Sequence, residues 1–423
     1  LCILRGCMPS KTLIESANRA MTIQRATEFG LRAENFSVRP DEILARKKKL
    51  VAQFADYRRG QLEKGNFDFI RGWASFLDPH RVEIVAANGE RRVIHGKTFL
   101  IATGSRRKTV RIPGLEEASF RDSDAALEWA AVPKSLIVLG AGPTGLEFAH
   151  YYAALGSHVT IIQRSAHILK SDDPDVSDAL ADALRKRGIQ IFTSTTLTCL
   201  EKTGEKKRIC FQHAGEEKSV EADEIIYALG REPNLMGIAT RAGLDECPVV
   251  NARQQSEVDH IFGAGDVVGP FEIVHIAVQQ GEVAARNAAR LVRQSHEKLE
   301  MVDYRLKLFV IFTVPEVASV GATEEELRCA GTKYRVAKAR FDDHGKSIVL
   351  GETEGFVKLI ADAETKEILG AAVVGPKASE LIHEIVAAMY FHATAADLLK
   401  IPHYHPTLSE IWTYPAEELV DDS

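Results

Sequence analysis

Two cysteines at the start of the sequence are the residues best suited to chemistry. Cys2 and Cys7 have four residues between them and stand just ahead of a helical pattern that begins at Ser10. A helix N-terminus lowers the pKa of a nearby thiol, and a cation such as Lys11 acts in the same direction. A close pair of such thiols is suited to thiol–disulfide exchange. Two unrelated thiols and half of a metal site are the alternatives.

The remaining cysteines argue against a disulfide scaffold. Six cysteines in 423 residues are too few for one. The other four are scattered along the sequence and are expected to be small, partly buried apolar residues: Cys199, Cys210, Cys247 and Cys329. No second close cysteine pair and no histidine cluster at metal-ligand spacing is found, so no metal site is expected.

A glycine-rich segment has the pattern of a nucleotide-binding turn. Gly140, Gly142 and Gly145 follow the apolar run 136–139 and precede a helical pattern. Glycines at this spacing allow a tight turn and a close approach of the backbone to a pyrophosphate at the helix N-terminus. A plain structural turn is the alternative, but the strand–turn–helix context favours a dinucleotide site.

The residues that end the next expected strand, 158–163, indicate the coenzyme. A site for NAD usually has an acidic residue here, which binds the ribose hydroxyls. The sequence has Gln163 and Arg164 instead, and an arginine suits the 2'-phosphate of NADP. NADP is therefore predicted, with NAD as the alternative that Gly145 mildly favours.

Two histidines and a glutamate lie close together near the end of the sequence: His403, His405 and Glu410. Histidine changes its charge near neutral pH and therefore suits acid–base catalysis. Thr407 and Glu410 have the spacing of a capping box, which predicts a helix start with a purely structural purpose. On spacing alone, both interpretations stay open.

Length and composition limit the class of protein. A chain of 423 residues is expected to form two or three domains, and 45% hydrophobic with 26% charged residues is ordinary for a globular enzyme. The net charge of −6 gives no reason to expect nucleic acid or an acidic membrane as partner. No apolar run reaches the roughly 18 residues of a membrane span, and the first residues do not resemble a signal peptide. A cytoplasmic location is predicted.

The elements that must position these residues follow from the hydrophobic pattern. Helices are expected over 10–27, 39–64 and 274–293, and short strands across 67–103. Strand–turn–helix–strand over 136–163 predicts a parallel doubly wound unit. A second glycine turn is expected at 262–266, a linker at 294–300, and mixed strands and helices over 309–423. The basic run 46–49 is expected on a solvated helix face.

Six short segments, taken in this order, resemble the class I pyridine nucleotide-disulfide oxidoreductases, which include lipoamide dehydrogenase, glutathione reductase and mercuric reductase. The segments are Cys2-x4-Cys7-Met8-Pro9-Ser10-Lys11, Ala102-Thr103-Gly104, the Gly140 turn with Glu147, Ala228-Leu229-Gly230-Arg231, Gly263-Ala264-Gly265-Asp266, and His405-Pro406-Thr407 with Ser409-Glu410. The resemblance extends over essentially the whole sequence.

The resemblance implies an α/β fold with two doubly wound, Rossmann-like nucleotide-binding domains and a C-terminal α+β dimerisation domain. The implied ranges are 1–132 with 251–300 for the FAD-binding domain, 133–250 for the NAD(P)-binding domain, and 301–423 for the dimerisation domain. Family members begin with a further strand–turn–strand unit of about 30 residues that holds the ADP half of FAD. The printed sequence has no such unit ahead of Cys2.

The resemblance also implies roles for single residues. NAD(P)H delivers hydride to the flavin, and the Cys2–Cys7 disulfide is then opened, with Cys7 as the charge-transfer thiolate and Cys2 as the thiol that attacks the substrate disulfide. His405, oriented by Glu410, is implied to be the acid–base catalyst and to serve the cysteines of the other subunit in an obligate homodimer. His403 is left as a structural or rim residue.

Further residues are implied to bind the cofactors. Lys11 would pair with Glu147 near the flavin, and Asp266 would bind the ribityl chain of FAD. The complete set expected to bind FAD or NADP is Lys11, Ala102, Thr103, Gly104, Gly140, Gly142, Gly145, Glu147, Gln163, Arg164, Gly230, Arg231, Gly265 and Asp266.

Among family members, lipoamide dehydrogenase is the most similar. The Pro-Ser-Lys that follows Cys7 distinguishes it from glutathione reductase. Mercuric reductase usually lacks the histidine at His405 and ends in a cysteine pair, whereas this sequence ends in Val420-Asp421-Asp422-Ser423. The predicted function is a dihydrolipoamide dehydrogenase-like NAD(P)H:disulfide oxidoreductase that acts on a small disulfide or dithiol. A mercuric-reductase-like or other flavin-dependent reductase, and a non-catalytic nucleotide-binding dimer, are the alternatives.

Overall fold

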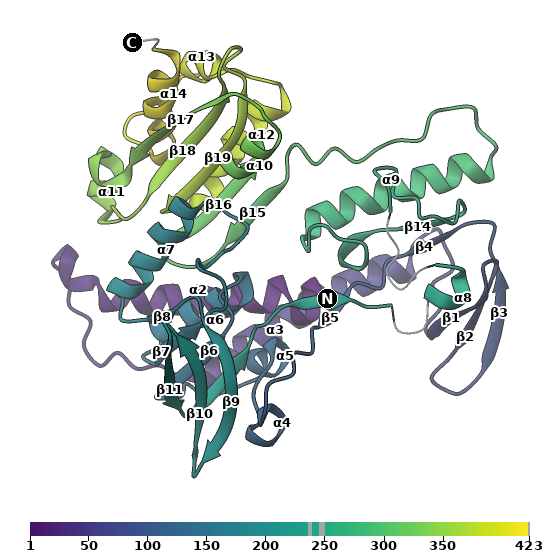
Figure 1. Cartoon of the computed structure of the whole chain (residues 1–423), viewed down its shortest axis with the longest axis horizontal. Coiled ribbons are helices and arrows are strands. Elements are labelled where there is room, and N and C mark those ends of the chain that lie inside the picture. Colours follow the sequence, from purple (N-terminus) through teal and green to yellow (C-terminus); the bar gives the residue numbers. More distant parts are fainter. Residues whose placement is uncertain (236–238, 245–249, 422–423) are drawn as a thin grey trace. The chain divides into compact units, whose positions relative to one another are not determined.

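The chain forms two compact units, which are described separately (Figure 1). The computed structural model describes residues 1–235, 239–244 and 250–421. The first unit comprises Leu1–Cys2, Ala52–Thr109 and Gly230–Tyr304, and the second comprises Ile3–Val51, Val110–Leu229 and Arg305–Ser423. The predicted α/β class is confirmed. No helix within the described ranges is long and apolar enough to cross a membrane.

The first unit consists of small sheets and one long helix. Strands β1 to β3 form an antiparallel sheet, β4 pairs in parallel with β14, and β5 pairs in antiparallel with β13. The bounds are β1 Trp73–Asp78, β2 Arg81–Val85, β3 Arg91–His95, β4 Phe99–Ile101, β5 Ser105–Arg107, β13 Arg231–Pro233, α8 Ala239–Ala242, β14 Ile261–Gly263, a 3-10 turn Gly265–Val267, and α9 Val274–Val292. Because β4 and β14 are parallel neighbours, the segments after Ile101 and Gly263 emerge at the same edge.

The N-terminal helices carry the cysteines. Helix α1 (Cys2–Arg5) starts at Cys2, and α2 (Cys7–Gln24) starts at Cys7, three residues before the predicted start at Ser10. Gly6 is the residue that caps α2, and its carbonyl accepts a hydrogen bond from the N–H of Ser10 at 3.2 Å. The buried face of α2 packs on α6 (Pro143–Ala154), which fixes where the N-terminus of α2 lies in the second unit.

A four-stranded parallel sheet in the order β12-β6-β7-β8 confirms the predicted doubly wound unit. The bounds are β6 Ser135–Leu139, β7 His158–Ile162, α7 Pro174–Lys186, β8 Gln190–Phe192 and β12 Glu224–Tyr227, with the short helices α4 Leu115–Ala118 and α5 Ser123–Leu127 before it. Four of the five residues of β6 are fully buried, as expected for a central parallel strand between helices.

Three antiparallel strands form a meander within the same part of the second unit. They are β9 Thr196–Thr203, β10 Lys206–His213 and β11 Glu216–Ala222, in the order β11-β10-β9. Leu200, Ile209 and Phe211 bury one face of this sheet in a core shared with Ile137 and Ile162. The opposite face is partly open to solvent.

The C-terminal part of the second unit is a five-stranded antiparallel sheet, β15-β16-β19-β18-β17, packed with helices (Figure 1). The bounds are β15 Leu308–Ile311, β16 Glu316–Gly321, α10 Glu324–Cys329, β17 Tyr334–Arg340, α11 Gly345–Leu350, β18 Phe356–Asp362, β19 Ile368–Gly375, α12 Ala378–Tyr390, α13 Ala395–Lys400, a 3-10 turn Leu408–Trp412, and α14 Thr413–Val420. Its core contains the fully buried Trp412 together with Ile382, Ile385 and Val373.

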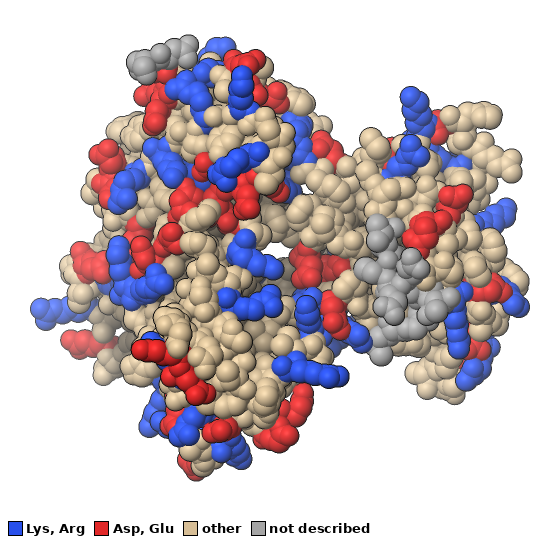
Figure 2. Space-filling view, viewed as in Figure 1, with Lys and Arg blue, Asp and Glu red and all other residues tan. Residues whose placement is uncertain are grey.

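The expectation about the basic run 46–49 is confirmed for Arg46, Lys48 and Lys49, which are exposed, and is wrong for Lys47 alone. Helix α3 (Pro40–Glu63) carries the basic run 46–49, but the Lys47 side chain is only 2% exposed and its ammonium pairs with Glu128. Its aliphatic stem is buried while the charged end reaches a carboxylate, which a count of charges along the sequence cannot reveal. Elsewhere, Figure 2 shows acidic and basic side chains interspersed over the visible face.

Candidate functional site

The glycine turn joins β6 to α6 in the geometry that a dinucleotide requires. Gly140 has φ +98°, and a Cβ there would lie 2.4 Å from the carbonyl oxygen of Ala228. A Cβ on Gly145 would lie 2.0 Å from the Gly140 carbonyl, so this glycine lets the helix pack on the turn. Gly142 caps α6 and has open space where its Cβ would stand. The helix N-terminus is thus accessible to an anionic group, and the turn fits a pyrophosphate.

The two residues after β7 have different surroundings. The side-chain oxygen of Gln163 accepts a hydrogen bond from the N–H of Ala141 at 3.0 Å, so the amide is attached to the glycine turn. Arg164 is exposed, and no side-chain partner for it is found among the described residues. A glutamine in this contact carries no charge that would repel a phosphate, and the neighbouring guanidinium is available to bind one.

A buried carboxylate holds the lysine of the cysteine segment. The Nζ of Lys11 donates to both oxygens of Glu147, at 2.7 and 2.8 Å, and Glu147 is 9% exposed against 32% for Lys11. The backbone N–H of Phe312 also donates to Glu147 at 3.3 Å, and the Phe312 ring centroid is 4.8 Å from the lysine Nζ. The pairing that the resemblance implied is therefore present, one helical turn after Cys7.

Both cysteines of the N-terminal pair are half-buried and each is the first residue of a helix, Cys2 of α1 and Cys7 of α2. The N–H groups in the first turn of a helix have no partner within the helix, and they favour negative charge on a nearby group. A thiolate at Cys7 is stabilised more than one at Cys2, because α2 has 18 residues and α1 has only four.

In the first unit, Asp266 belongs to a polar network at the ends of β4 and β14. Ser105 donates to a carboxylate oxygen of Asp266 at 2.7 Å, and Arg231 donates to the Ser105 hydroxyl at 2.6 Å and to its carbonyl at 2.7 Å. Burial and then the charge of Asp266 raise the pKa of Glu272, which the charge of Arg231 partly offsets. One charged cluster therefore joins residues from the expected FAD segments.

The backbone turns of this cluster are held by neighbouring side chains. Thr103 donates to the Asn234 carbonyl at 2.6 Å, and the Asn234 N–H donates to the Gly104 carbonyl at 2.9 Å. Gln280, which is fully buried in α9, accepts from the Gly265 N–H at 2.8 Å. Gly104, Gly230 and Gly265 all have positive φ, which explains why glycine occupies these positions.

The two histidines near the C-terminus each contact a glutamate but differ in exposure. The Nδ1 of His405 lies 2.8 Å from Glu410, and the imidazole is 80% exposed. The Nε2 of His403 lies 2.6 Å from Glu384, and this imidazole is 8% exposed. The hydrogen bond from His405, and then that from the Thr407 N–H at 2.8 Å, lower the pKa of Glu410. Glu410 therefore both starts the helical turn and orients His405.

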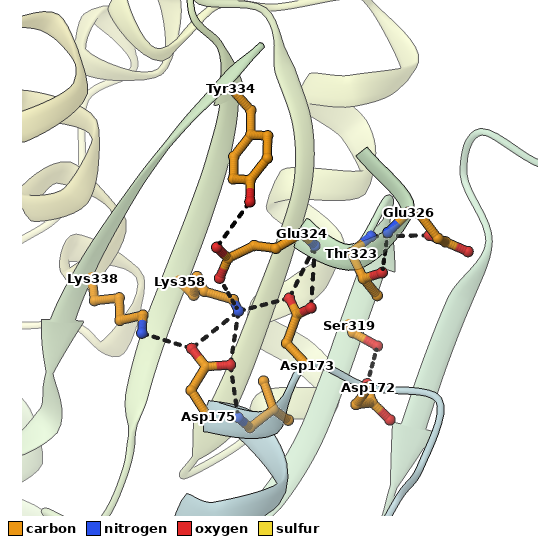
Figure 3. Close-up of polar contacts among 11 residues, drawn as sticks. Asp172, Asp173, Asp175, Ser319, Thr323, Glu324, Glu326, Tyr334, Lys338 and Lys358 are labelled. Atoms are coloured by element: carbon orange, nitrogen blue, oxygen red, sulfur yellow. Dashed lines mark hydrogen bonds and ion pairs between the residues drawn. The ribbon is translucent and has the colours of Figure 1, made fainter. Parts of the chain in front are cut away.

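A second charged cluster in the second unit surrounds Lys358 (Figure 3). Its Nζ lies 2.7 Å from Asp173, 2.8 Å from Asp175 and 3.1 Å from Glu324, and the lysine side chain is 1% exposed. The three carboxylates are close enough together to hold a metal ion. The Lys358 ammonium already stands among them and, together with the Lys338 ammonium 2.7 Å from Asp175, offsets most of their negative charge.

The structure brings together some of the predicted site residues and adds others. Gly140, Gly142, Gly145 and Gln163 meet at one turn, and Thr103, Gly104, Arg231 and Asp266 share the network of the first unit. The residues that sequence reasoning missed are Ser105, Gln280 and Phe312, which hold Asp266, Gly265 and Glu147. No local pattern identifies them, because each acts on a residue distant in sequence.

Comparison with known proteins adds an independent observation. The sequence matches the family described as pyridine nucleotide-disulphide oxidoreductase over residues 1–281, and the dimerisation domain of that family over residues 309–416. The dihydrolipoyl dehydrogenase of Chlamydia trachomatis is 32% identical over 99% of this chain and 89% of its own length. That of Bacillus subtilis is 32% identical over 97% of this chain and 88% of its own length.

Solved structures agree with the sequence comparison. LpdA from Mycobacterium tuberculosis is similar with a TM-score of 0.86 and 25% identity, covering 99% of this chain and 91% of LpdA. The HOCl-induced flavoprotein disulfide reductase RclA from Escherichia coli is similar with a TM-score of 0.83 and 25% identity, covering 98% of this chain and 90% of RclA.

Proposed function

Because the chain belongs to the pyridine nucleotide-disulphide oxidoreductases, we propose that it uses NADPH to reduce a small disulfide through the Cys2–Cys7 pair. At the coarser level, it is a dihydrolipoyl dehydrogenase-like enzyme of a family that depends on FAD and NAD(P), and its dimerisation domain supports a homodimer. The preference for NADPH, the substrate class, the domain ranges and a cytoplasmic location are parts of the proposal.

The coenzyme preference rests on the residues after β7. Gln163 contacts the glycine turn through a neutral amide where NAD sites usually have a carboxylate. Arg164 is exposed beside it and suits the 2'-phosphate of NADPH. An exposed arginine that meets a phosphate forms a charge-assisted contact, and this contact is lost with NADH.

The thiol chemistry rests on two groups of residues. Cys7 stands in the first turn of α2, where helix N–H groups favour a thiolate, and Lys11 follows with its ammonium held by Glu147. Bound FAD would carry reducing equivalents from the nicotinamide to the Cys2–Cys7 disulfide. We propose Lys11, Glu147, Thr103, Arg231 and Asp266 as FAD-binding residues, since their carboxylates, ammonium and turns suit the isoalloxazine and ribityl groups.

The observation that carries the proposal is the contact of His405 with Glu410. An imidazole that is oriented by a carboxylate and otherwise exposed can accept a proton from an attacking thiol and return it to the leaving thiol. Reduction of a metal ion or a quinone at the flavin has no such thiol step. The 80% exposure of His405 in one chain is consistent with a partner subunit that supplies the thiols.

The test is a set of visible spectra of the FAD-loaded dimer, taken anaerobically before and after addition of NADPH. A long-wavelength charge-transfer band is expected because reduction of the disulfide leaves the Cys7 thiolate beside the flavin. In Cys7→Ser the band should be absent and disulfide reductase activity lost. Full disulfide reductase activity in Cys7→Ser would overturn the thiol mechanism and favour direct reduction at the flavin.

The coenzyme preference has its own test. Arg164→Gln should raise the KM for NADPH by about tenfold, which is the low end for a charge-assisted hydrogen bond at an exposed site, and should leave the KM for NADH unchanged. Lys170→Gln is the control, because Lys170 is also exposed in the loop after β7. An equal change for both coenzymes in Arg164→Gln would contradict a role in recognising the 2'-phosphate.

A further inference from the structure

Two of the cysteines that seemed scattered in the sequence face each other in the structure. The register of the meander places Cys199 of β9 directly opposite Cys210 of β10. Both are half-buried, as predicted, but nothing in the sequence indicates that they are neighbours. The prediction of burial is wrong for Cys329, which is exposed at the end of α10, and Cys247 lies outside the described residues.

The geometry of the pair is that of a dithiol. Residues directly opposed on antiparallel strands have their Cα atoms about 4.5–5.5 Å apart, which lies within the range of about 4.4–6.8 Å that a disulfide spans. Cys199 and Cys210 point to the outer face of the meander, because their neighbours Leu200 and Ile209 are buried in the core below. Both cysteines are half-buried, so a small reagent can reach them.

A β-bulge lies next to the pair and interrupts the pairing of β9 with β10. The register shifts between Cys210 and Phe211, where Phe211 pairs with Leu197 and leaves Thr198 as the extra residue on β9. Bulges increase the local twist and change the direction of nearby side chains. The hydroxyl of Thr198 is buried and makes no hydrogen bond.

The charges around the pair give the two sulfurs different properties. Burial, then the hydrogen bond and charge of Cys199, and then the charges of Glu201 and Glu217 raise the pKa of Cys210 to about 11. Cys210 therefore keeps its proton at neutral pH. Glu201 also lies 3.8 Å from the sulfur of Cys199, so the pair sits in acidic surroundings. The negative charges of Glu201 and Glu217 repel an anionic disulfide, so a small neutral oxidant suits the pair better, and the thiolate fraction of Cys199 is the form that attacks it.

We propose that Cys199 and Cys210 form a second redox site, which a hydroperoxide closes to a disulfide. The Cys199 sulfur first attacks the peroxide, forming a sulfenic acid and releasing the alcohol, or water in the case of hydrogen peroxide. The Cys210 sulfur then attacks the sulfenic sulfur, the S–S bond forms, and the hydroxyl leaves as water with the Cys210 proton. Two thiols are oxidised by two electrons, and one peroxide bond is reduced.

The Cys199–Cys210 site differs from the Cys2–Cys7 pair in its position in the fold and in its proposed chemistry. It joins β9 to β10 within the meander, whereas Cys2 and Cys7 belong to the N-terminal helices. A disulfide here would fix the two strands at a point where a bulge otherwise interrupts their ladder. The proposal does not depend on the substrate or on the coenzyme of the enzyme.

Peptide mapping of the FAD-loaded protein tests the proposal. After treatment with one equivalent of hydrogen peroxide and blocking with N-ethylmaleimide, trypsin separates Cys199, in residues 188–202, from Cys210, in residues 209–218. The expected product is these two peptides linked, with a loss of two hydrogens that dithiothreitol reverses. Recovery of both peptides as separate N-ethylmaleimide adducts, after Cys329 has become oxidised, would overturn the proposal.

Two variants show which cysteine reacts first, and this test does not depend on detecting the disulfide-linked peptides. Cys210→Ser should accumulate a sulfenic acid on Cys199 that dimedone traps, because the second thiol is missing. In Cys199→Ser, trapping on Cys210 should be much weaker at neutral pH. Strong dimedone labelling of Cys329 and none of Cys199 in Cys210→Ser would also overturn the proposal. Far-ultraviolet circular dichroism of the same samples, before peroxide is added, shows that each variant is folded.

Discussion

The His405–Glu410 pair and the Lys358 cluster show two opposite uses of charge in the second unit. In both, a nitrogen cation or imidazole lies within 2.8 Å of a carboxylate. The imidazole of His405 is 80% exposed, whereas the Lys358 side chain is 1% exposed and has three acidic neighbours. An exposed pair can exchange protons with another molecule. A buried cluster whose carboxylates already share an ammonium instead holds its elements together.

The surroundings of Lys358 explain why it stays charged. Burial lowers its pKa, but the hydrogen bonds that its ammonium donates to Asp173 and Asp175, together with the charges of these carboxylates, outweigh burial and raise the pKa above the ordinary value. The carboxylates come from the start of α7 and the lysine from β18, with Glu324 at the start of α10. The cluster therefore attaches the parallel-sheet part of the second unit to the C-terminal sheet.

The largest effect is expected from His405→Gln, which removes the proton-transferring group. Acid–base catalysis contributes about a hundredfold to ten-thousandfold, so disulfide reductase kcat should fall by that factor. The free energy of unfolding should hardly change, because the side chain is exposed. Steady-state kinetics and urea unfolding measure the two quantities.

His403→Gln is the matched control for His405→Gln. Its imidazole is buried against Glu384, so it should lose stability while keeping its turnover. If His403→Gln lost kcat and His405→Gln kept it, exposure would not distinguish the working histidine from the structural one.

A smaller effect, on stability alone, is expected from Lys358→Met. Removing one partner of a buried ion pair costs about 3–5 kcal/mol, because Asp173, Asp175 and Glu324 would keep their charges without the cation. Urea unfolding measures the loss. Lys338→Met is the control: Lys338 also pairs with Asp175, at 2.7 Å, but is 42% exposed, so a change of about 0–1 kcal/mol is expected. Equal losses in the two variants would contradict the importance of burial.

The smallest effect concerns Asp172, next to the Lys358 cluster. Burial raises its pKa to about 6, and the hydrogen bond from Ser319 partly opposes this. The folded protein then holds this proton more tightly than the unfolded chain, so stability falls as pH rises from about 4 to about 6. In Asp172→Asn, the decrease in the free energy of unfolding over this pH range should be smaller by about 1–3 kcal/mol. Urea unfolding at pH 4.5 and pH 7.5 measures the difference.

Ser319→Ala provides the opposite change at the same carboxylate. It removes a hydrogen bond that favours the ionised form of Asp172, so the fall of stability with pH should become steeper. If Asp172→Asn and the parent protein had the same pH dependence, Asp172 would not be the group that titrates in this range.

Short contiguous segments could be interpreted from the sequence. Gly140, Gly142 and Gly145 lie in a strand–turn–helix context whose backbone requirements are local, and the structure places them at one turn. The closeness of Cys2 and Cys7 and of His405 and Glu410 is likewise visible in the sequence. Their roles in catalysis stay predictions. The family resemblance added the Lys11–Glu147 pair, which joins residues 136 positions apart.

By itself, the sequence determined the α/β class, the family and the residues of its contiguous motifs, because helix starts, glycine turns and hydrophobic periods depend on near neighbours. Only the tertiary structure decided which distant residues meet. Lys358 contacts Asp173 across 185 positions, and a shift of one residue in the β9–β10 register would separate Cys199 from Cys210. Strand register and burial are set by packing of the whole unit, so no local pattern contains them.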